Sequence, residues 1–335
     1  MFRLLSDNLL SPPILFFFLG VFGRWVRSDL SIPEPLPRLF GLYLLWAIGF
    51  KGGVSIAAAG LSWGVVVPLV VMMLLSAALP LIAYPLLRRR FNSADSCATA
   101  AAYGSVSVVT FITAANFLSA QGIDYSGYLV AAIALMEFPA IITAVVLYRV
   151  VTSRGAEQPP TAAAVRKHAS SFGSLVRESL LSGPVFLLLG SMVVGALTGE
   201  RGWAALETFC EDIFHGILVL FLLEAGMRAS ERLGELGRVW MFALFTGIAL
   251  ALGNAAIGAG LAWLLGMSAG DGFLLMILCA SASYIAVPAT MRLAIPEANP
   301  SIYLPMALGI TFPFNIAFGI PLYLVIMKWL TGTAV

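Results

Sequence analysis

Residues 279–303 read CASASYIAVPATMRLAIPEANPSIY, a run of small residues, hydroxyls and prolines in a chain that is otherwise strongly apolar. Ser281 and Ser283 lie near its start, and Val287-Pro288 follows them. Proline removes a backbone donor and clashes with the preceding helical turn, so this stretch predicts an interrupted helix. An irregular backbone at membrane depth persists only where it is buried in protein or lines a cavity. We therefore expect half of a binding site here.

Composition identifies the chain as a polytopic membrane protein. Of its 335 residues 60% are hydrophobic and 11% charged, and the mean hydropathy is +0.95, whereas soluble domains carry about 25% charged residues. A net charge of +2 gives no reason to expect a nucleic-acid partner. Cys97, Cys210 and Cys279 are too far apart in sequence for a metal signature or a disulfide framework. His168 and His215 lack partners at ligand spacing, and no catalytic motif is present, so we do not expect an enzyme.

The apolar segments predict an all-α fold of ten membrane spans, since each is close to the roughly 20 residues that a bilayer requires. The expected spans are 11–27, 37–59, 63–87, 96–119, 127–150, 180–198, 211–230, 238–266, 271–292 and 300–330. They divide the chain into a first five-helix unit (1–151), a Pro- and Ser-containing linker (152–179) and a second five-helix unit (180–335).

The distribution of Lys and Arg predicts the orientation. With the N-terminus outside, fifteen of the nineteen basic residues fall on the inner side and three on the outer side, while Lys51 lies within a span. Basic residues concentrate on the cytoplasmic side of membrane proteins. Both termini are therefore expected outside, with the linker in the cytoplasm and the protein in the plasma (inner) membrane.

Two units of five spans have opposite orientations in the membrane, so an inverted repeat is the expected architecture. An offset of 176 residues matches three polar positions of the fourth and ninth spans. The matched pairs are Asp95 with Asp271, Ser105 with Ser281, and Ser107 with Ser283. Three pairs at one offset favour duplication.

The fourth span repeats the interrupted pattern, reading AAYGSVSVVTFITAANF over residues 101–117. Two interruptions at matched positions of inverted repeats indicate a transporter's site near the midplane. Half-helix N-termini would direct N–H groups at an anion, and hydroxyls would complete its hydrogen bonds. The alternative is that small residues only allow the helices to pack closely.

Three ionisable residues lie deep in apolar segments: Lys51, Glu137 and Glu224. For Lys51 and Glu224 we expect an ion pair between the two units, with a Glu224–Arg228 pair one turn apart as the alternative. Glu137 precedes Phe138-Pro139, and the proline would free a carbonyl beside the carboxyl group. That combination suits sodium or a proton, and the alternative is a carboxyl kept neutral by burial.

Taken together, these motifs resemble the SbtA-type sodium-dependent bicarbonate permeases over nearly the whole chain. The segments that carry the resemblance are YGSVS (103–107) with Thr110, MEFPA (136–140), GM (226–227), LGEL (233–236) and RLAIPEANPS (292–301). The resemblance implies ten helices in two inverted repeats, helices 4 and 9 broken, and separate core and gate domains. It also implies a homotrimer, an elevator-like movement and a cytoplasmic PII-like regulator.

Carried over by position, the resemblance places the substrate between the two broken spans. Bicarbonate would be bound by Ser105, Ser107, Thr110, Ser281 and Ser283. Tyr284, which is not part of the family pattern, is expected to add a hydrogen bond to the anion. Sodium, as the coupling ion, would be held by Glu137, Ser107 and Ser283, and no cofactor is expected. Glu137 stands where the family has an aspartate.

The second broken span departs from the family at one important position. The family has serines followed by aspartate and then Gly-Pro, whereas this chain has Ser281-Ala282-Ser283-Tyr284 and then Val287-Pro288. A neutral phenol is a poorer cation ligand than a carboxylate. The sequence therefore predicts a secondary transporter of a small monovalent anion, with sodium-dependent bicarbonate uptake as the first hypothesis. A channel-like or sensory protein of the same fold, and a transporter of another small anion, remain alternatives.

Overall fold

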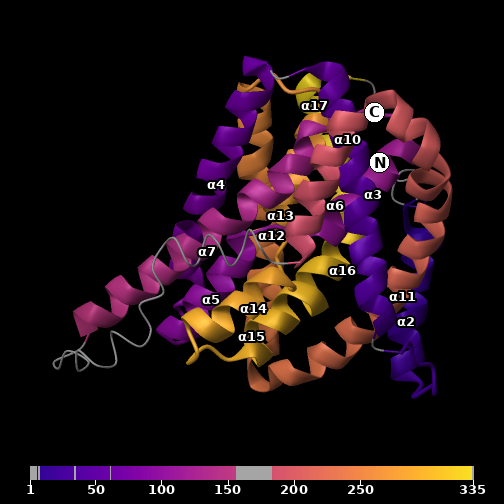
Figure 1. Ribbon diagram of the computed structural model, residues 1–335. Helices are drawn as coiled ribbons and strands as arrows, with labels where there is room; N and C mark the ends of the chain where they lie inside the picture. Colours follow the sequence, from indigo (N-terminus) through magenta and orange to yellow (C-terminus); the bar gives the residue numbers. More distant parts are fainter. Residues whose placement is uncertain (1–5, 7, 34, 61, 156–182, 334–335) are drawn as a thin grey trace.

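The computed structural model describes residues 6, 8–33, 35–60, 62–155 and 183–333, which form helices and loops without a strand (Figure 1). The first half contains α2 (Pro12–Trp25), α3 (Pro35–Ala59), α4 (Trp63–Leu87), α5 (Ser93–Gly104), α6 (Val108–Ala120) and α7 (Tyr128–Gly155). The second half contains α10 (Gly183–Glu207), the π-helix η1 (Thr208–Asp212), α11 (Ile213–Leu233), the 3-10 helix η2 (Gly234–Val239) and α12 (Trp240–Leu264). It continues with α13 (Ala269–Ala280), α14 (Ala286–Ala294), α15 (Pro300–Leu304), the π-helix η3 (Pro305–Thr311), α16 (Phe312–Phe314), the π-helix η4 (Asn315–Gly319) and α17 (Ile320–Thr331).

Each predicted span overlaps a helix or a series of helices, and the largest difference is at the end of the sixth span, where α10 continues to Glu207. Residues 180–182 of that span lie outside the described residues. Six helical runs within the described residues are long and apolar enough to cross a membrane, and one of them, Phe186–Leu264, combines α10, α11 and α12. The helices α2 and α13 are apolar but shorter. The end of α7 includes residues 152–155 of the predicted linker, whereas the rest of the linker, including His168, lies outside the described residues. The polytopic α-helical class is thus confirmed.

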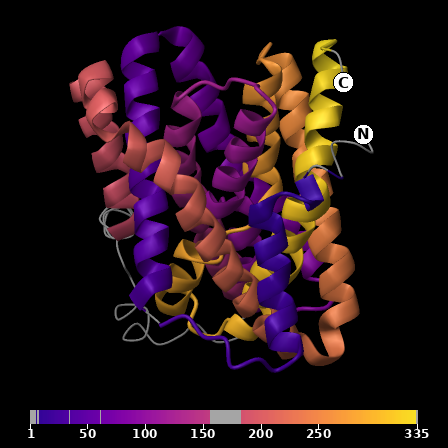
Figure 2. The ribbon, with the colours of Figure 1, turned by 90° about the vertical axis from the view of Figure 1, so that its right-hand side faces the viewer.

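The helices form two groups. The smaller group, α2, α3, α10 and α11, is built from the closely packed pairs α3–α10 and α2–α11. The larger group contains α4 to α7 and α12 to α17, in which α4 packs on α5 and α7, and α12 and α17 pack on α13. Figure 1 shows α2, α3 and α11 on the right and α4, α5 and α7 on the left, and Figure 2 shows the smaller group face on.

Glycines allow the paired helices of the smaller group to approach backbone to backbone. A Cβ atom on Gly53 of α3 would collide with the carbonyl of Met192, and one on Gly195 of α10 would collide with the carbonyl of Phe50. The same reciprocal contact joins α2 and α11 through Gly20 and Gly226. Small residues that let helix backbones approach are typical of helix packing in lipid. The glycines of the GFKGGV stretch in α3 thus serve helix packing.

The larger group encloses the two interrupted helices. Every residue of α5 from Ala94 to Gly104, and every residue of α13 from Gly270 to Ala280, is buried. Cys97 and Cys279 lie in these helices, and both are free and buried, as is Cys210. Because α5 consists mainly of small side chains, α4 and α7 pack closely against it. The breaks that follow α5 and α13 are thus held inside the protein.

Candidate functional site

Both predicted interruptions occur, and each leaves a short non-helical segment inside the larger group. α5 ends at Gly104 and α6 begins at Val108, while α13 ends at Ala280 and α14 begins at Ala286. The role predicted for Pro288 is wrong, because this proline lies in the first turn of α14. An N–H group there has no partner within the helix, so proline is tolerated. The break comes before it, at residues 281–285.

The two breaks cross and bind each other through backbone groups. The Ser107 N–H donates to the Ser281 hydroxyl at 2.9 Å, and that hydroxyl donates to the carbonyl of Leu278 at 3.0 Å. In return, the Ser283 N–H donates to the carbonyl of Ala102 at 2.9 Å. The reciprocal bonds fix the two segments against one another. Residues that lie 174 or more positions apart in sequence thus meet at one crossing.

Amide side chains cap the two helices that end at the crossing. Asn254 donates from Nδ2 to the carbonyl of Tyr103 at 3.1 Å, and Asn315 donates to the carbonyl of Ala280 at 2.9 Å. The Tyr103 hydroxyl lies 2.6 Å from the hydroxyl of Thr311. Leaving a buried carbonyl without a partner costs about 1–3 kcal/mol. The sequence analysis missed these supports, although an asparagine in an apolar span is itself a signal, because it is costly in lipid unless bonded.

Asp95 and Asp271, the carboxylates that suggested the repeat, form corresponding ties. Asp95 accepts a hydrogen bond from the N–H of Asn299 at 2.7 Å. Asp271 accepts from the N–H and the hydroxyl of Ser126, at 2.6 and 2.8 Å. Each carboxylate lies in the first turn of a half-helix and binds the loop that follows the broken helix of the other unit. Both are therefore structural groups.

Three hydroxyls at the crossing are buried and have no hydrogen-bond partner among the described residues. They belong to Ser105, Thr110 and Tyr284. Buried polar groups in folded proteins are nearly always paired, so orphaned ones require an explanation. The Tyr284 hydroxyl lies near Ser107, yet it forms no hydrogen bond of normal geometry. Its ring packs edge-on against Phe312, with 5.6 Å between the ring centroids. These groups are free to bind a small ligand.

The other three predicted site hydroxyls are already engaged by the protein. Ser281 uses its hydroxyl in the crossing, as described above. The Ser107 hydroxyl accepts from the Thr110 N–H at 3.2 Å, and the Ser283 hydroxyl accepts from the Val287 N–H at 3.4 Å. As acceptors, Ser107 and Ser283 still have their own O–H groups to donate. The six predicted residues thus meet at the crossing: three have hydroxyls bonded to the protein, and three have hydroxyls without a partner among the described residues.

Glu137 is buried on α7, with 7% of the residue exposed. It lies one turn before Ala140, whose side chain packs near Gly104 at the end of α5. Residues three apart share a helix face, so Glu137 lies on the face of α7 that packs against α5. No hydrogen bond joins it to Ser107 or Ser283 within the described residues, nor do three or more His, Cys, Asp or Glu side chains gather there into a metal site. Its role in sodium binding stays a prediction.

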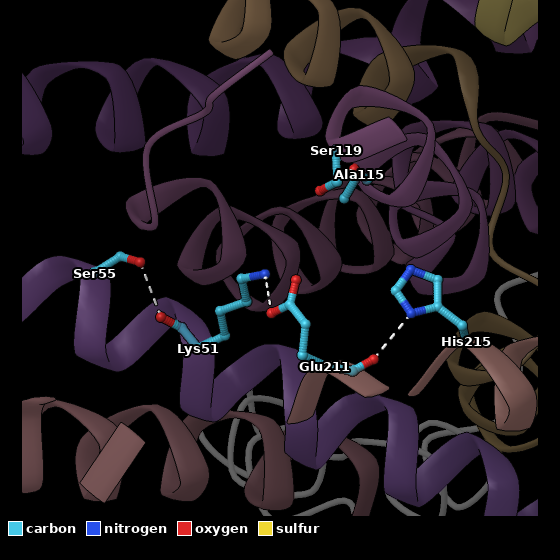
Figure 3. A network of polar contacts seen from close by, with 6 residues as sticks. All are labelled: Lys51, Ser55, Ala115, Ser119, Glu211 and His215. Atoms are coloured by element: carbon cyan, nitrogen blue, oxygen red, sulfur yellow. Dashed lines mark hydrogen bonds and ion pairs between the residues drawn. The ribbon is translucent and has the colours of Figure 1, made fainter. Parts of the chain in front are cut away.

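The expected ion pair between Lys51 and Glu224 is wrong. Lys51 pairs with Glu211 at 2.7 Å, and Glu224 pairs with Arg228 one turn on, which is the alternative considered for it. Figure 3 shows the Lys51 and Glu211 side chains pointing at one another, with His215 bonded to the backbone of Glu211 at 2.9 Å. The pair still joins the two halves of the chain, but through a residue of η1.

The fold and the crossing define a class of protein: a polytopic α-helical membrane protein in which two broken helices meet around unpaired hydroxyls. Discontinuous helices of this kind form the midplane sites of secondary transporters. The chain belongs to the Na+-dependent bicarbonate transporter superfamily, whose sequence model matches residues 12–328. No curated protein is similar to it in sequence. Membership places the chain among transporters, in agreement with the expectation that it is not an enzyme.

Proposed function

We propose that the chain is a secondary transporter that takes up bicarbonate, which binds where the two broken helices cross. The observation that carries the proposal is a set of three buried hydroxyls at this crossing that have no hydrogen-bond partner among the described residues. Family membership supports bicarbonate as the anion. An anion of this size accepts several hydrogen bonds, which the unpaired hydroxyls of Ser105, Thr110 and Tyr284 donate.

The anion also benefits from the two helices that begin at the crossing. The first turns of α6 and α14 have N–H groups without partners inside the helix, and the helix dipoles favour negative charge there. Ser107 and Ser283 add donors, while Ser281 holds the two breaks in register. The site thus binds a monovalent anion without burying a cationic side chain beside it.

Sodium is the proposed coupling ion, held by Glu137 with Ser107 and Ser283. An ionised carboxylate buried without a counter-ion is costly, so a bound cation would stabilise it. Hydroxyl and backbone oxygens are suitable additional ligands for a hard cation. Tyr284, in the place of a family aspartate, then serves the anion instead of the cation.

The proposed architecture has ten membrane helices in two inverted five-helix repeats. The reciprocal ties of Asp95 and Asp271 support it, as does the pairing of α2 with α11 and of α3 with α10. In this scheme the smaller helix group is the gate domain and the larger group the core domain, which moves as an elevator. A homotrimer, a cytoplasmic PII-like regulator, the inner membrane and outward-facing termini complete the proposal.

The test is uptake of labelled bicarbonate into proteoliposomes, with and without an imposed sodium gradient, by the wild type and by Tyr284→Asp. Sodium-driven accumulation by the wild type is the expected result. Activity that appears only in Tyr284→Asp would refute coupling in the native chain. Bicarbonate binding without accumulation, or single-channel conductance, would favour the channel-like alternative, and inhibition by a small carboxylate without bicarbonate uptake would indicate another anion.

A further inference from the structure

A small cavity lies between the smaller helix group and α6. Its volume is about 30 Å³, and one water molecule needs about 10–15 Å³ of such space. Lys51 of α3, Glu211 of η1 and His215 of α11 line one side, and α6 lines the other with Asn116 and Ser119. The cavity therefore has room for about two waters or a small anion, and its walls carry charge.

The α6 side of the cavity is a single helix face that leads back to the crossing. It is lined by Ile112, Ala115, Asn116 and Ser119, which recur at spacings of three and four residues and so share one face. Because an α-helix rises about 1.5 Å per residue, Ile112 lies roughly 6 Å from the start of α6 at Val108. An anion in this cavity is thus close to the helix whose first turn helps to form the proposed substrate site.

Lys51 is suited to receive such an anion. Its side chain is 37% exposed, and its ammonium group binds one carboxylate, that of Glu211 (Figure 3). An ammonium group has three donors, so within the described part of the chain two remain for a ligand. The ammonium nitrogen also lies 5.6 Å from the centroid of the Trp203 ring, which holds it in place by a cation–π contact.

Glu211 presents to Lys51 the same planar CO2 group that bicarbonate carries. Both partners of the pair are more than a third exposed and line the cavity, so a ligand in the cavity can reach the ammonium group. Because a second oxyanion offers the ammonium group the same kind of acceptor, it can replace the glutamate there. In the resting structure the glutamate occupies the position on Lys51 that a substrate would take.

We propose that Lys51 is a docking residue for the transported anion, which displaces the Glu211 carboxylate on its way to the crossing. This inference rests on the proposed function and adds a second anion site, separate from the hydroxyls of the broken helices. Glu211 acts as an internal competitor that keeps the lysine paired when no substrate is present.

If the anion displaces Glu211 from Lys51, replacing the two residues should change the KM for bicarbonate in opposite directions. Lys51→Met should raise the KM for bicarbonate roughly tenfold, as expected for the loss of one hydrogen bond to a charged group. Glu211→Gln should lower the KM, because the competitor is gone. Lys328→Met, the same change near the end of α17, should leave the KM unchanged. If both single variants raised the KM equally, and the charge-reversed double variant Lys51→Glu/Glu211→Lys restored it, the pair would be purely structural. That result would overturn the proposal.

A binding measurement separates this proposal from the proposed function. Bicarbonate added to purified protein, against sodium chloride of equal ionic strength, should change the fluorescence of Trp203 as Lys51 shifts. The change should be absent in Trp203→Phe and in Lys51→Met. A fluorescence change without bicarbonate uptake would support the docking site and refute the proposed transport function. Bicarbonate uptake without a fluorescence change, together with a wild-type KM in Lys51→Met, would refute the docking site. The proposed transport function would then still hold.

Discussion

Replacing Thr110 by valine tests the substrate site with the least disturbance of the fold. The two side chains have nearly the same shape, and the Thr110 hydroxyl is buried with no hydrogen-bond partner in the described part of the chain. A buried polar group without a partner costs about 1–3 kcal/mol. Thr110→Val should therefore leave the free energy of unfolding unchanged or raise it by about 1 kcal/mol.

Substrate binding should respond in the opposite direction. A hydrogen bond to a charged ligand contributes about 1.5–3 kcal/mol, and each 1.4 kcal/mol is about a tenfold change in affinity. The KM for bicarbonate should therefore rise about 10- to 150-fold in Thr110→Val, while the thermal midpoint stays at or above that of the wild type. Uptake into proteoliposomes and thermal unfolding in detergent measure the two quantities.

Thr113 supplies a matched control on the same helix. It is also buried, but its hydroxyl donates to the carbonyl of Val109 at 2.8 Å. Thr113→Val should leave the KM unchanged. If Thr110→Val kept a wild-type KM, or if both variants raised it equally, the unpaired hydroxyl would not be a substrate ligand and the assignment of the site would fail.

Three further substitutions test the supports of the site and the packing of the smaller helix group. Asp271→Asn removes the charged acceptor of the two Ser126 bonds and should lower the stability by about 1–3 kcal/mol, seen as a lower thermal midpoint. Asn315→Leu leaves the carbonyl at the end of α13 unpaired and should lower the stability by a similar amount, with a loss of bicarbonate uptake. Unchanged uptake would show that this cap is not needed. Gly53→Ala places a methyl group against a carbonyl of α10 and should destabilise the protein by about 1–3 kcal/mol. The control is Gly190→Ala, whose methyl group meets no described atom within 4 Å and should leave the stability unchanged. Equal thermal midpoints of the two variants would contradict the close helix contact.

Helix boundaries and the two interruptions were predictable because each depends on local composition. Apolar length set the spans, and clustered small and hydroxyl residues marked the breaks after Gly104 and Ala280. The position of Pro288 was misread because a proline disrupts a helix interior but fits the first turn. Sequence alone could not tell these cases apart, since the helix start depends on where the preceding segment is bound.

Pairings between distant residues were the part that the sequence could not supply. Lys51 pairs with Glu211 instead of Glu224 because the π-helical turn at residues 208–212 brings Glu211 to α3. The periodicity of apolar residues in the sequence does not predict such a turn. Asn254 was overlooked inside a glycine-rich stretch for a related reason. Its meaning depends on which carbonyl lies opposite, and that is decided by the rotation of α12 against α5.

The reciprocal bonds at the crossing have a consequence for how the protein is made. Ser107 and Asp95 take partners from Ser281 and Asn299, which leave the ribosome roughly 190 residues later. At about 5–20 residues per second, the first broken helix waits roughly 10–40 s in the bilayer before the segments that close it exist. During that interval its backbone groups need other partners, such as water, lipid headgroups or the insertion machinery, so a chain that stalls before residue 281 should be more open to proteolysis than the full-length protein.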